Sequence, residues 1–270
     1  MLGHSTYTAY QHINNMELKE EARVFTNLLY ETIQNDMSVT TMTVGISLAH
    51  KHDFLNLYEI ANAVVEPSQT LADFMNQVIG GPVIYNKNKR SFNNSIILKL
   101  PTKQSVKIFC NGTLHITGFK KAQDAVEMAD MFTVLIELAL GGSGINQDFR
   151  ISGFDVQLIN ACFCPPCFKD QKINLTRLQE YLRTQSMFYS TYNTDRHAGV
   201  MVKAPEFTLL IFESANIIIT SVKAPHQLRL AYDYINPFLE THHDMLVQDQ
   251  LTTNVKSTKE FDYSSYVVLK

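Results

Sequence analysis

Two stretches of the chain share one pattern, and this repetition limits the possible folds more than any other feature of the sequence. The stretches are KIFCNGTLHITGFK, residues 107–120, and LIFESANIIITSVK, residues 210–223. Each contains Ile-Phe, a short polar turn, an alternating segment that ends in Ile-Thr, and a lysine at the same internal spacing. The matched positions are Ile108-Phe109 and Ile211-Phe212, Ile116-Thr117 and Ile219-Thr220, and Lys120 and Lys223. A helical pattern follows each stretch, so the sequence predicts an internal duplication.

The composition is that of an ordinary globular protein. The 270 residues include 23 basic and 26 acidic side chains, and the formal net charge of −3 gives no indication of nucleic-acid binding. No apolar run is long enough to span a bilayer, and the first residues lack the charged-then-apolar pattern of a signal peptide. We therefore expect no membrane association and no secretion, and a nuclear, cytoplasmic or viral-interior setting.

Three of the four cysteines, Cys162, Cys164 and Cys167, lie in ACFCPPCF, where Cys-x-x-Cys resembles half of a zinc site. A closed site needs a fourth ligand, and neither a second cysteine pair nor a nearby histidine pair supplies one. We expect structural thiols, with no metal and no cofactor. The chain also lacks GxSxG, a phosphate-binding glycine loop and HExxH, which argues against an enzyme.

Apolar periodicity and turn residues predict the same order of elements in both halves. A helix over 16–34 comes first, and the tail after Asp244 is expected to be loosely attached. The first half has a strand at 39–48, helices that begin after Asp53 and Ser68, strands at 95–100, 106–110 and 113–117, and a long helix from 121. The second half has a strand at 151–162, a helix at 175–183, strands at 199–203, 207–212 and 217–222, and a helix at 226–241. The expected domains are an N-terminal extension at 1–36, repeat one at 37–142 with an insertion at about 64–92, a linker at 143–150, repeat two at 151–241, and a tail at 242–270.

The alternation along the strands leaves one face of the predicted sheet unusually apolar. Phe109 and Phe212 lie on this face at equivalent positions, beside threonines and hydrogen-bond donors. Large apolar side chains on an open sheet face are typical of a binding surface. The alternative is that the two halves, or the N-terminal helix, cover this face.

With these residues in view, the chain resembles the TATA-binding protein family over roughly 39–239. The two stretches quoted above are similar to the family's repeat, and LRLAYDYINPFL resembles its terminal helix, including Ile235, Pro237 and Leu239. The resemblance implies an α+β saddle, in which two pseudo-symmetric repeats form one curved antiparallel sheet with helices on the convex side. The family is the standard example of proteins that bind the DNA minor groove and insert apolar wedges.

The resemblance assigns DNA contacts residue by residue. Phe92, Phe109 and Phe212 match wedge phenylalanines, and the fourth wedge position falls on Asp195, so stronger bending is expected at the first-repeat end. The alternative is that Tyr192 or His197, from the same loop, substitutes for the missing ring. Thr41 lies nearest to one of the family's paired asparagines, and Asn160 lies two residues after the other. The remaining groove and phosphate contacts are Thr117, Thr220, Leu210, Ile218, Lys107, His115, Lys120 and Lys223.

These matches imply a transcription initiation factor that bends AT-rich double-stranded promoter DNA, with other initiation factors or RNA polymerase as partners. The acidic AQDAVEMADMF stands where the family has a basic, partner-recruiting helix, which favours a distant member, such as one encoded by a large DNA virus and acting in the nucleus or in a viral factory. The alternative function is a protein-interaction platform that keeps the fold without tight DNA binding. The low positive charge favours this alternative, because phosphate neutralisation supplies much of non-specific affinity.

Overall fold

The centre of the molecule is one antiparallel sheet of ten strands. The computed structural model describes residues 16–33, 36–50, 54–85, 94–141 and 149–248. The strand order across the sheet is β2-β3-β4-β5-β1-β6-β10-β9-β8-β7. The first sheet half consists of β1 (Ser38–Ala49), β2 (Ile84–Tyr85), β3 (Ser95–Lys99), β4 (Ser105–Phe109) and β5 (Thr113–Phe119). The second sheet half consists of β6 (Arg150–Phe163), β7 (Tyr189–Thr191), β8 (Val200–Lys203), β9 (Thr208–Ile211) and β10 (Ile217–Val222).

The two halves meet along β1 and β6, the two longest strands, and the order of strands outward from this junction is the same in both. From β1 the neighbours are β5, β4, β3 and β2, and from β6 they are β10, β9, β8 and β7. Each half therefore has one strand more than the sequence predicted. The extra strands, β2 and β7, are only two and three residues long, too short to give a readable alternation.

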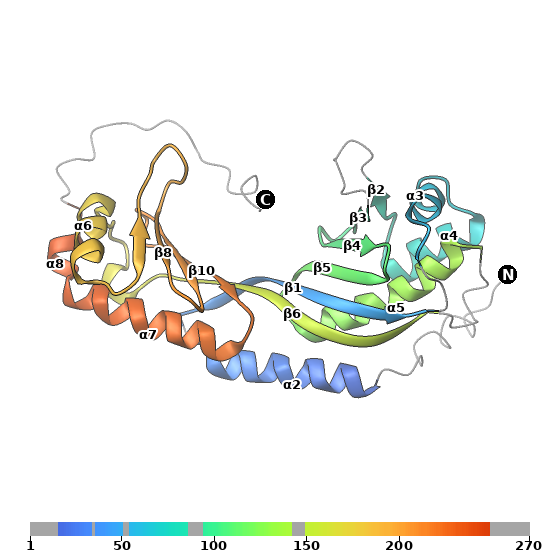
Figure 1. Ribbon diagram of the computed structural model, residues 1–270, viewed down its shortest axis with the longest axis horizontal. Coiled ribbons are helices and arrows are strands. Elements are labelled where there is room, and N and C mark those ends of the chain that lie inside the picture. Colours follow the sequence, from blue (N-terminus) through green and yellow to red (C-terminus); the bar gives the residue numbers. More distant parts are fainter. Residues whose placement is uncertain (1–15, 34–35, 51–53, 86–93, 142–148, 249–270) are drawn as a thin grey trace.

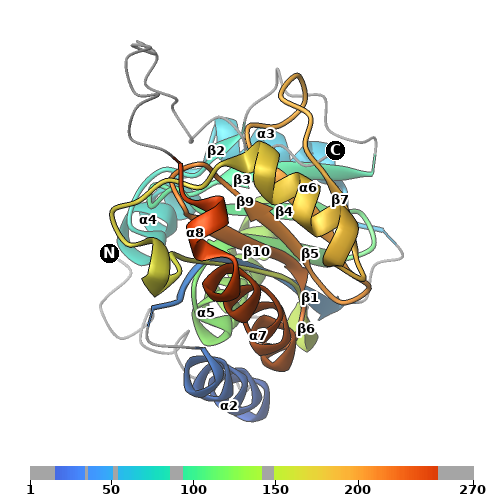
Figure 2. The same ribbon diagram turned by 90° about the vertical axis from the view of Figure 1, so that its left-hand side faces the viewer.

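Three long helices cover one face of the sheet. These are α2 (Met16–Thr32), α5 (Ala122–Ala139) and α7 (Pro225–Thr241). In Figure 1 the two ends of the sheet rise on one side, and these helices lie on the other side. Figure 2 shows α2 as the outermost of the three. The open face, opposite these helices, is hereafter the concave face.

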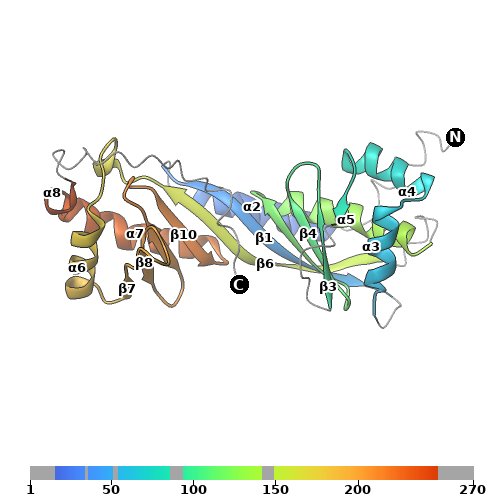
Figure 3. The same ribbon diagram turned by 90° about the horizontal axis from the view of Figure 1, so that it is seen from above.

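Shorter helices lie at the two ends of the molecule, as Figure 3 shows from above. The end of the first half carries α3 (Leu57–Val65), α4 (Gln69–Phe74) and the π-helical turn η1 (Met75–Ile79). The end of the second half carries η2 (Pro166–Phe168), α6 (Leu175–Gln185) and α8 (His243–Leu246). The insertion expected at about 64–92 thus contains α4, η1 and β2, and residues 86–93 lie outside the described residues.

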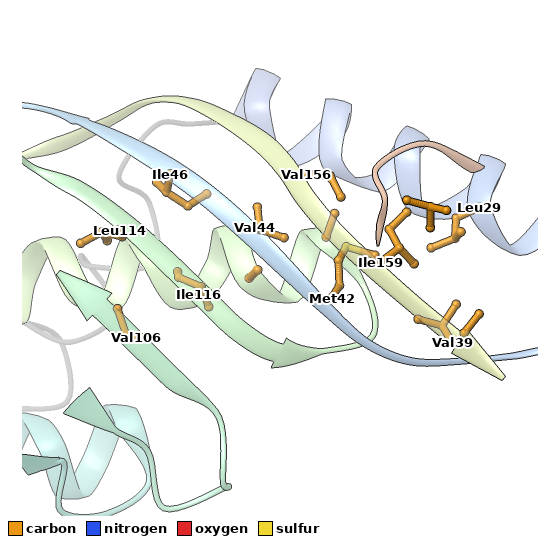
Figure 4. Close-up of a cluster of buried hydrophobic side chains, with 14 of the residues drawn as sticks. Leu29, Val39, Met42, Val44, Ile46, Val106, Leu114, Ile116, Val156 and Ile159 are labelled. Atoms are coloured by element: carbon orange, nitrogen blue, oxygen red, sulfur yellow. The ribbon is translucent and has the colours of Figure 1, made fainter. Parts of the chain in front are cut away.

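Alternate strand residues point at the helices and form the core. Figure 4 shows this layer, in which Leu29 of α2 lies near Ile159 of β6, and side chains of β1, β4 and β5 continue the layer away from α2. The buried side chains in this view include Val39, Met42, Val44, Ile46, Val106, Leu114, Ile116, Val156 and Ile159. The period-two burial explains why the sheet could be read from sequence, because β-branched residues alternate with polar ones on a half-buried strand.

Helix α2 ties the two halves together. Its residues contact both α5 and α7, and Ala22 and Leu29 are fully buried. The Thr26 hydroxyl accepts a 3.1 Å hydrogen bond from the Ala122 backbone N–H at the start of α5. Lys19 forms an ion pair with Asp130 of α5. The helical extension predicted over 16–34 is therefore part of the main core.

Two local predictions need correction. The helix expected to be capped by Asp53 is instead capped by Asn56, whose side chain accepts from the Glu59 N–H at 3.2 Å, and Asp53 lies outside the described residues. The start of the predicted loose tail is packed, because Leu246 is fully buried and Val247 pairs with Ile173. The short apolar run Met245-Leu246-Val247 in a polar segment gave no periodicity from which to predict this. Within the described residues, no helix is long and apolar enough to cross a membrane.

Candidate nucleic-acid interface

The concave face carries the side chains that alternate with the buried ones. The predicted site residues Thr41, Lys107, Phe109, His115, Thr117, Asn160, Leu210, Phe212, Ile218 and Thr220 are all partly exposed. Their strand neighbours, such as Ile108, Ile116, Ile211 and Ile219, are fully buried against the helices. Helix α2 lies on the opposite side of the sheet (Figure 2), so it does not cover this face.

A row of polar groups crosses the centre of the concave face. The Thr43 and Thr117 hydroxyls lie 3.2 Å apart, and the Thr220 hydroxyl donates to Asn160 Oδ1 at 2.6 Å. Thr41 pairs with Asn160 across the β1–β6 junction. Thr43 was not among the predicted site residues. Its contact with Thr117 depends on the register between β1 and β5, which are far apart in the sequence. Because the Asn160 oxygen already accepts from Thr220, its amide N–H groups are directed at other acceptors.

Phe109 and Phe212 precede identical tight turns. The Gly112 N–H donates to Phe109 O at 3.0 Å, and the Ala215 N–H donates to Phe212 O at 2.9 Å. Both turn residues have positive φ, 82° at Gly112 and 61° at Ala215. The residues after Thr117 and Thr220 also match, with φ of 103° at Gly118 and 63° at Ser221. The equivalence read from the sequence thus extends to backbone conformation.

In the first half, polar side chains surround the phenylalanine. The His115 ring meets the Phe109 ring edge-on with centroids 4.8 Å apart, and Lys107 Nζ lies 4.5 Å from the same ring centroid. Burial and, secondarily, the Lys107 charge lower the pKa of His115. At pH 7 the imidazole is therefore neutral, and the fixed positive charge at this place belongs to Lys107.

In the second half, an aromatic ring lies beside Phe212. The fourth wedge position falls on Asp195, for which the sequence offered Tyr192 or His197 as a substitute, and the His197 ring is the one that contacts Phe212, with centroids 5.5 Å apart. The Gly199 N–H donates to His197 Nδ1 at 3.1 Å. A side chain at Gly199 would lie 2.7 Å from Ile211 O and 3.2 Å from the Phe212 ring, so glycine is required for this contact. The pattern His-x-Gly before a strand was the available signal.

The lysines of the site lie at equivalent places. Lys120 and Lys223 are exposed at the ends of the repeated stretches, just before α5 and α7. Strand register adds a second pair that the sequence reading missed. Lys99 pairs with Ser105, which pairs with Thr117, and Lys203 pairs with Thr208, which pairs with Thr220. Phe92, the remaining predicted contact, lies outside the described residues.

The cysteines form no obvious metal centre. All four are free thiols, and within residues 16–248, apart from the undescribed gaps, no group of three or more His, Cys, Asp or Glu side chains could hold a metal ion. Burial is the main cause that raises the pKa values of Cys164 and Cys167. Both thiols are consequently protonated at neutral pH.

Comparison with known proteins agrees with this geometry. Residues 156–242 match the family model described as transcription factor TFIID, or TATA-binding protein. The TATA-box-binding proteins of Bombyx mori and Spodoptera frugiperda are each 29% identical over 137 residues, which cover 50% of this chain and 40% of each relative. The TBP of Methanococcus jannaschii has a similar fold, with a TM-score of 0.51, 16% identity, and coverage of 76% of this chain and 99% of that one.

The second half of the chain thus matches the TATA-binding protein family model, and the fold as a whole is similar to that of the archaeal TBP. The α+β saddle expected from the sequence is confirmed by the fold of the archaeal TBP and by the single antiparallel sheet with its helices. The chain matches 40% of the length of each curated insect relative, and the family model matches residues 156–242, within the second half of the chain. The family matched over residues 156–242 is one of transcription factors, which is consistent with the expectation that the chain is not an enzyme.

Proposed function

We propose that this protein binds the minor groove of AT-rich double-stranded DNA with its concave face and bends that DNA during transcription initiation. The observation that carries the proposal is the placement of Phe109 and Phe212 on matching turns of an open sheet face. Apolar rings inserted between base steps unstack them, and the bent DNA then contacts more protein surface. Flexible steps cost the least to deform, which favours some AT-rich sequences.

The centre of the face suits the minor groove of A·T pairs. An A·T pair presents only acceptors there, adenine N3 and thymine O2, whereas guanine adds an amino donor. The Asn160 amide can donate to these acceptors because its oxygen is occupied by Thr220. Leu210 and Ile218 offer no acceptor to a guanine amino group, so a G·C pair beneath them would leave that group unsatisfied.

In this proposal four lysines contact phosphates on either side of the groove: Lys120, Lys223, Lys99 and Lys203. These contacts offset the unfavourable overall charge of −3, since each phosphate neutralised releases counterions. Initiation factors or RNA polymerase would bind other surfaces of the complex, in the nucleus or in a viral factory.

The test measures bending and salt dependence together. A double-labelled AT-rich duplex should show increased fluorescence transfer when the protein binds. Replacing both Lys120 and Lys223 by alanine should reduce the slope of log K against log salt by about 2, because each phosphate contact contributes about 0.9. Arg23 and Arg229, exposed on the helices of the opposite face, form the matched control pair. Their replacement should leave the slope within about 0.5 of the parent value.

The second candidate function is a protein-interaction platform. It is favoured by the acidic side chains of α5, which include Asp124, Glu127 and Asp130. A parent protein that neither bends the duplex nor binds it with a measurable salt slope would decide for this candidate.

A further inference from the structure

The two halves of the concave face differ in chemistry where their strands are equivalent. In the first half, the register across the sheet runs from Ile97 through Lys107, His115 and Gly45 to Asp155. In the second half it runs from Met201 through Leu210, Ile218 and Cys162 to Ser38. The first half therefore carries a charged and hydrogen-bonding row at the place where the second half carries a mainly apolar one.

A carboxylate–amide pair ends the first row. Gln157 Nε2 donates to Asp155 Oδ2 at 2.5 Å. Gly45 has no side chain, and Gln157 fills the vacant place, because a Cβ on Gly45 would lie 3.2 Å from Gln157 Nε2. Asp155 is exposed, and Gln157 is partly exposed.

A β-bulge aims this pair at the concave face. Thr43 pairs with Leu158 and Val44 with Val156, so Gln157 is an extra residue with no partner on β1. Bulges of this kind redirect side chains. The corresponding bulge of the other half occurs at Thr40, between Val39 and Thr41. There the side chains are small, and the Thr40 hydroxyl is bonded to Asn160 O at 3.1 Å.

We propose that the Asp155 carboxylate, oriented by Gln157, accepts a hydrogen bond from the exocyclic amino group of a guanine in the minor groove. The first half of the face would then prefer a G·C pair and the second half an A·T pair. The proposal rests on the proposed function, since it assigns base specificity to that same face. Guanine N2 is the only minor-groove donor. Above an A·T pair the carboxylate would meet only acceptors, and this repulsion adds discrimination against the wrong pair.

Lys107 does not provide this selection. Lys107 only donates, and every base pair offers minor-groove acceptors, so its contact is the same for all sequences. In the row of the second half, Leu210 and Ile218 offer neither donor nor acceptor, and the polar atoms of Ser38 and Cys162 lie 3.3 Å from each other. A binding site with one G·C-preferring end and one A·T-preferring end would also fix the direction in which the protein sits on DNA.

The experiment uses a set of AT-rich duplexes in which a single G·C pair is placed at each position in turn, and a second set with an inosine·C pair at the same positions. Fluorescence anisotropy measures the affinity of the protein for each duplex. Inosine lacks only the minor-groove amino group, so each comparison isolates that donor. At one end of the site, guanine should bind about tenfold more tightly than inosine, the factor expected for one good base contact. At the other end, inosine should bind more tightly than guanine.

Asp155→Ala should abolish the guanine preference at the first end and leave the inosine preference at the second end unchanged. Ser38→Ala, at the equivalent position of the other half, is the matched control and should change neither preference. Inosine that binds as tightly as guanine at every position, or a guanine preference that survives in Asp155→Ala, would overturn the inference while DNA binding itself stands. Failure of the parent protein to bind any duplex would overturn the proposed function and this inference with it.

Discussion

The first and second halves of the sheet have the same strand order and matching turns, but different side-chain chemistry. Both place a phenylalanine before a positive-φ turn and a threonine before a second positive-φ residue. The ring of Phe109 is surrounded by Lys107 and His115, whereas Phe212 lies beside His197 and the apolar side chains of Leu210 and Ile218. Two halves can therefore keep a common geometry while each carries its own surface chemistry. The side chains on the buried face of a strand pack against the helices, and those on the exposed face are free to differ.

The halves also differ in how the long helices begin. The first N–H of α5, at Ala122, is satisfied by Thr26 of α2, and Tyr30 of α2 contacts the Lys120 carbonyl at 3.4 Å. The start of α7 is capped from within, because Gln227 Oε1 accepts from both Lys223 and Ala224 N–H groups. The N-terminal end of α5 is thus capped by a side chain of α2, whereas the N-terminal end of α7 is capped by a side chain of α7 itself.

The largest expected effect concerns the two wedges. Phe109→Ala and Phe212→Ala should each weaken binding to an AT-rich duplex by about 1–3 kcal/mol, the usual cost of removing a ring that stacks on a base. His197 supplies the second ring at Phe212, so His197→Ala should couple to Phe212→Ala by about 0.5–1.5 kcal/mol in a double-mutant cycle. The cycle with Phe109→Ala is the control and should show no coupling.

The sequence alone predicted weaker bending at the second end, because Asp195 stood at the fourth wedge position. The His197–Phe212 contact leads us instead to expect similar bending losses from the two phenylalanine substitutions. A loss at Phe109 that exceeds the loss at Phe212 by more than about 1 kcal/mol, without any effect of His197, would restore the earlier expectation.

A smaller effect should distinguish the two helix caps. Thr26→Ala should lower the free energy of unfolding by about 0.5–2 kcal/mol, because it leaves the buried Ala122 N–H without its acceptor. Gln227→Ala should cost less, since water can reach this partly exposed cap. Urea denaturation of each variant makes the comparison. Thr32→Ala, which removes only a hydrogen bond to Leu28 O within α2, is the control and should cost no more than about 0.5 kcal/mol. Equal costs at Thr26 and Gln227 would refute the dependence of α5 on α2.

The smallest expected effect concerns the paired turn positions, Gly118 and Ser221. Ser221 is exposed and has a φ of 63°, which costs a non-glycine residue about 1 kcal/mol. Ser221→Gly should therefore raise stability by about 0.5 kcal/mol after the entropic cost of glycine is included. The reciprocal Gly118→Ser should lower stability by about 1 kcal/mol or more, since its Cβ would lie 3.1 Å from Gln104. Thermal unfolding measures both. An unchanged midpoint in Gly118→Ser would show that the two turns are not under the same constraint.

The sequence by itself determined the elements and their periodicity. The alternation around Phe109 and Phe212 predicted which strand residues are buried and which are exposed, because a half-buried strand records its two faces locally. Repetition at matched spacing predicted the equivalence of the two stretches, and the resemblance to the TATA-binding proteins predicted the saddle.

Only the tertiary structure decided which side chains meet. The contact of Thr43 with Thr117, the pairing of Lys99 and Lys203 with the threonine rows, and the placement of Gln157 over Gly45 all depend on strand register between distant segments. A shift of one residue in register, or one bulge, exchanges the faces of a strand without changing its local pattern. The same reason explains His197. Its approach to Phe212 depends on how a loop folds back onto β9, and that path is fixed by packing at Gly199 rather than by any local periodicity.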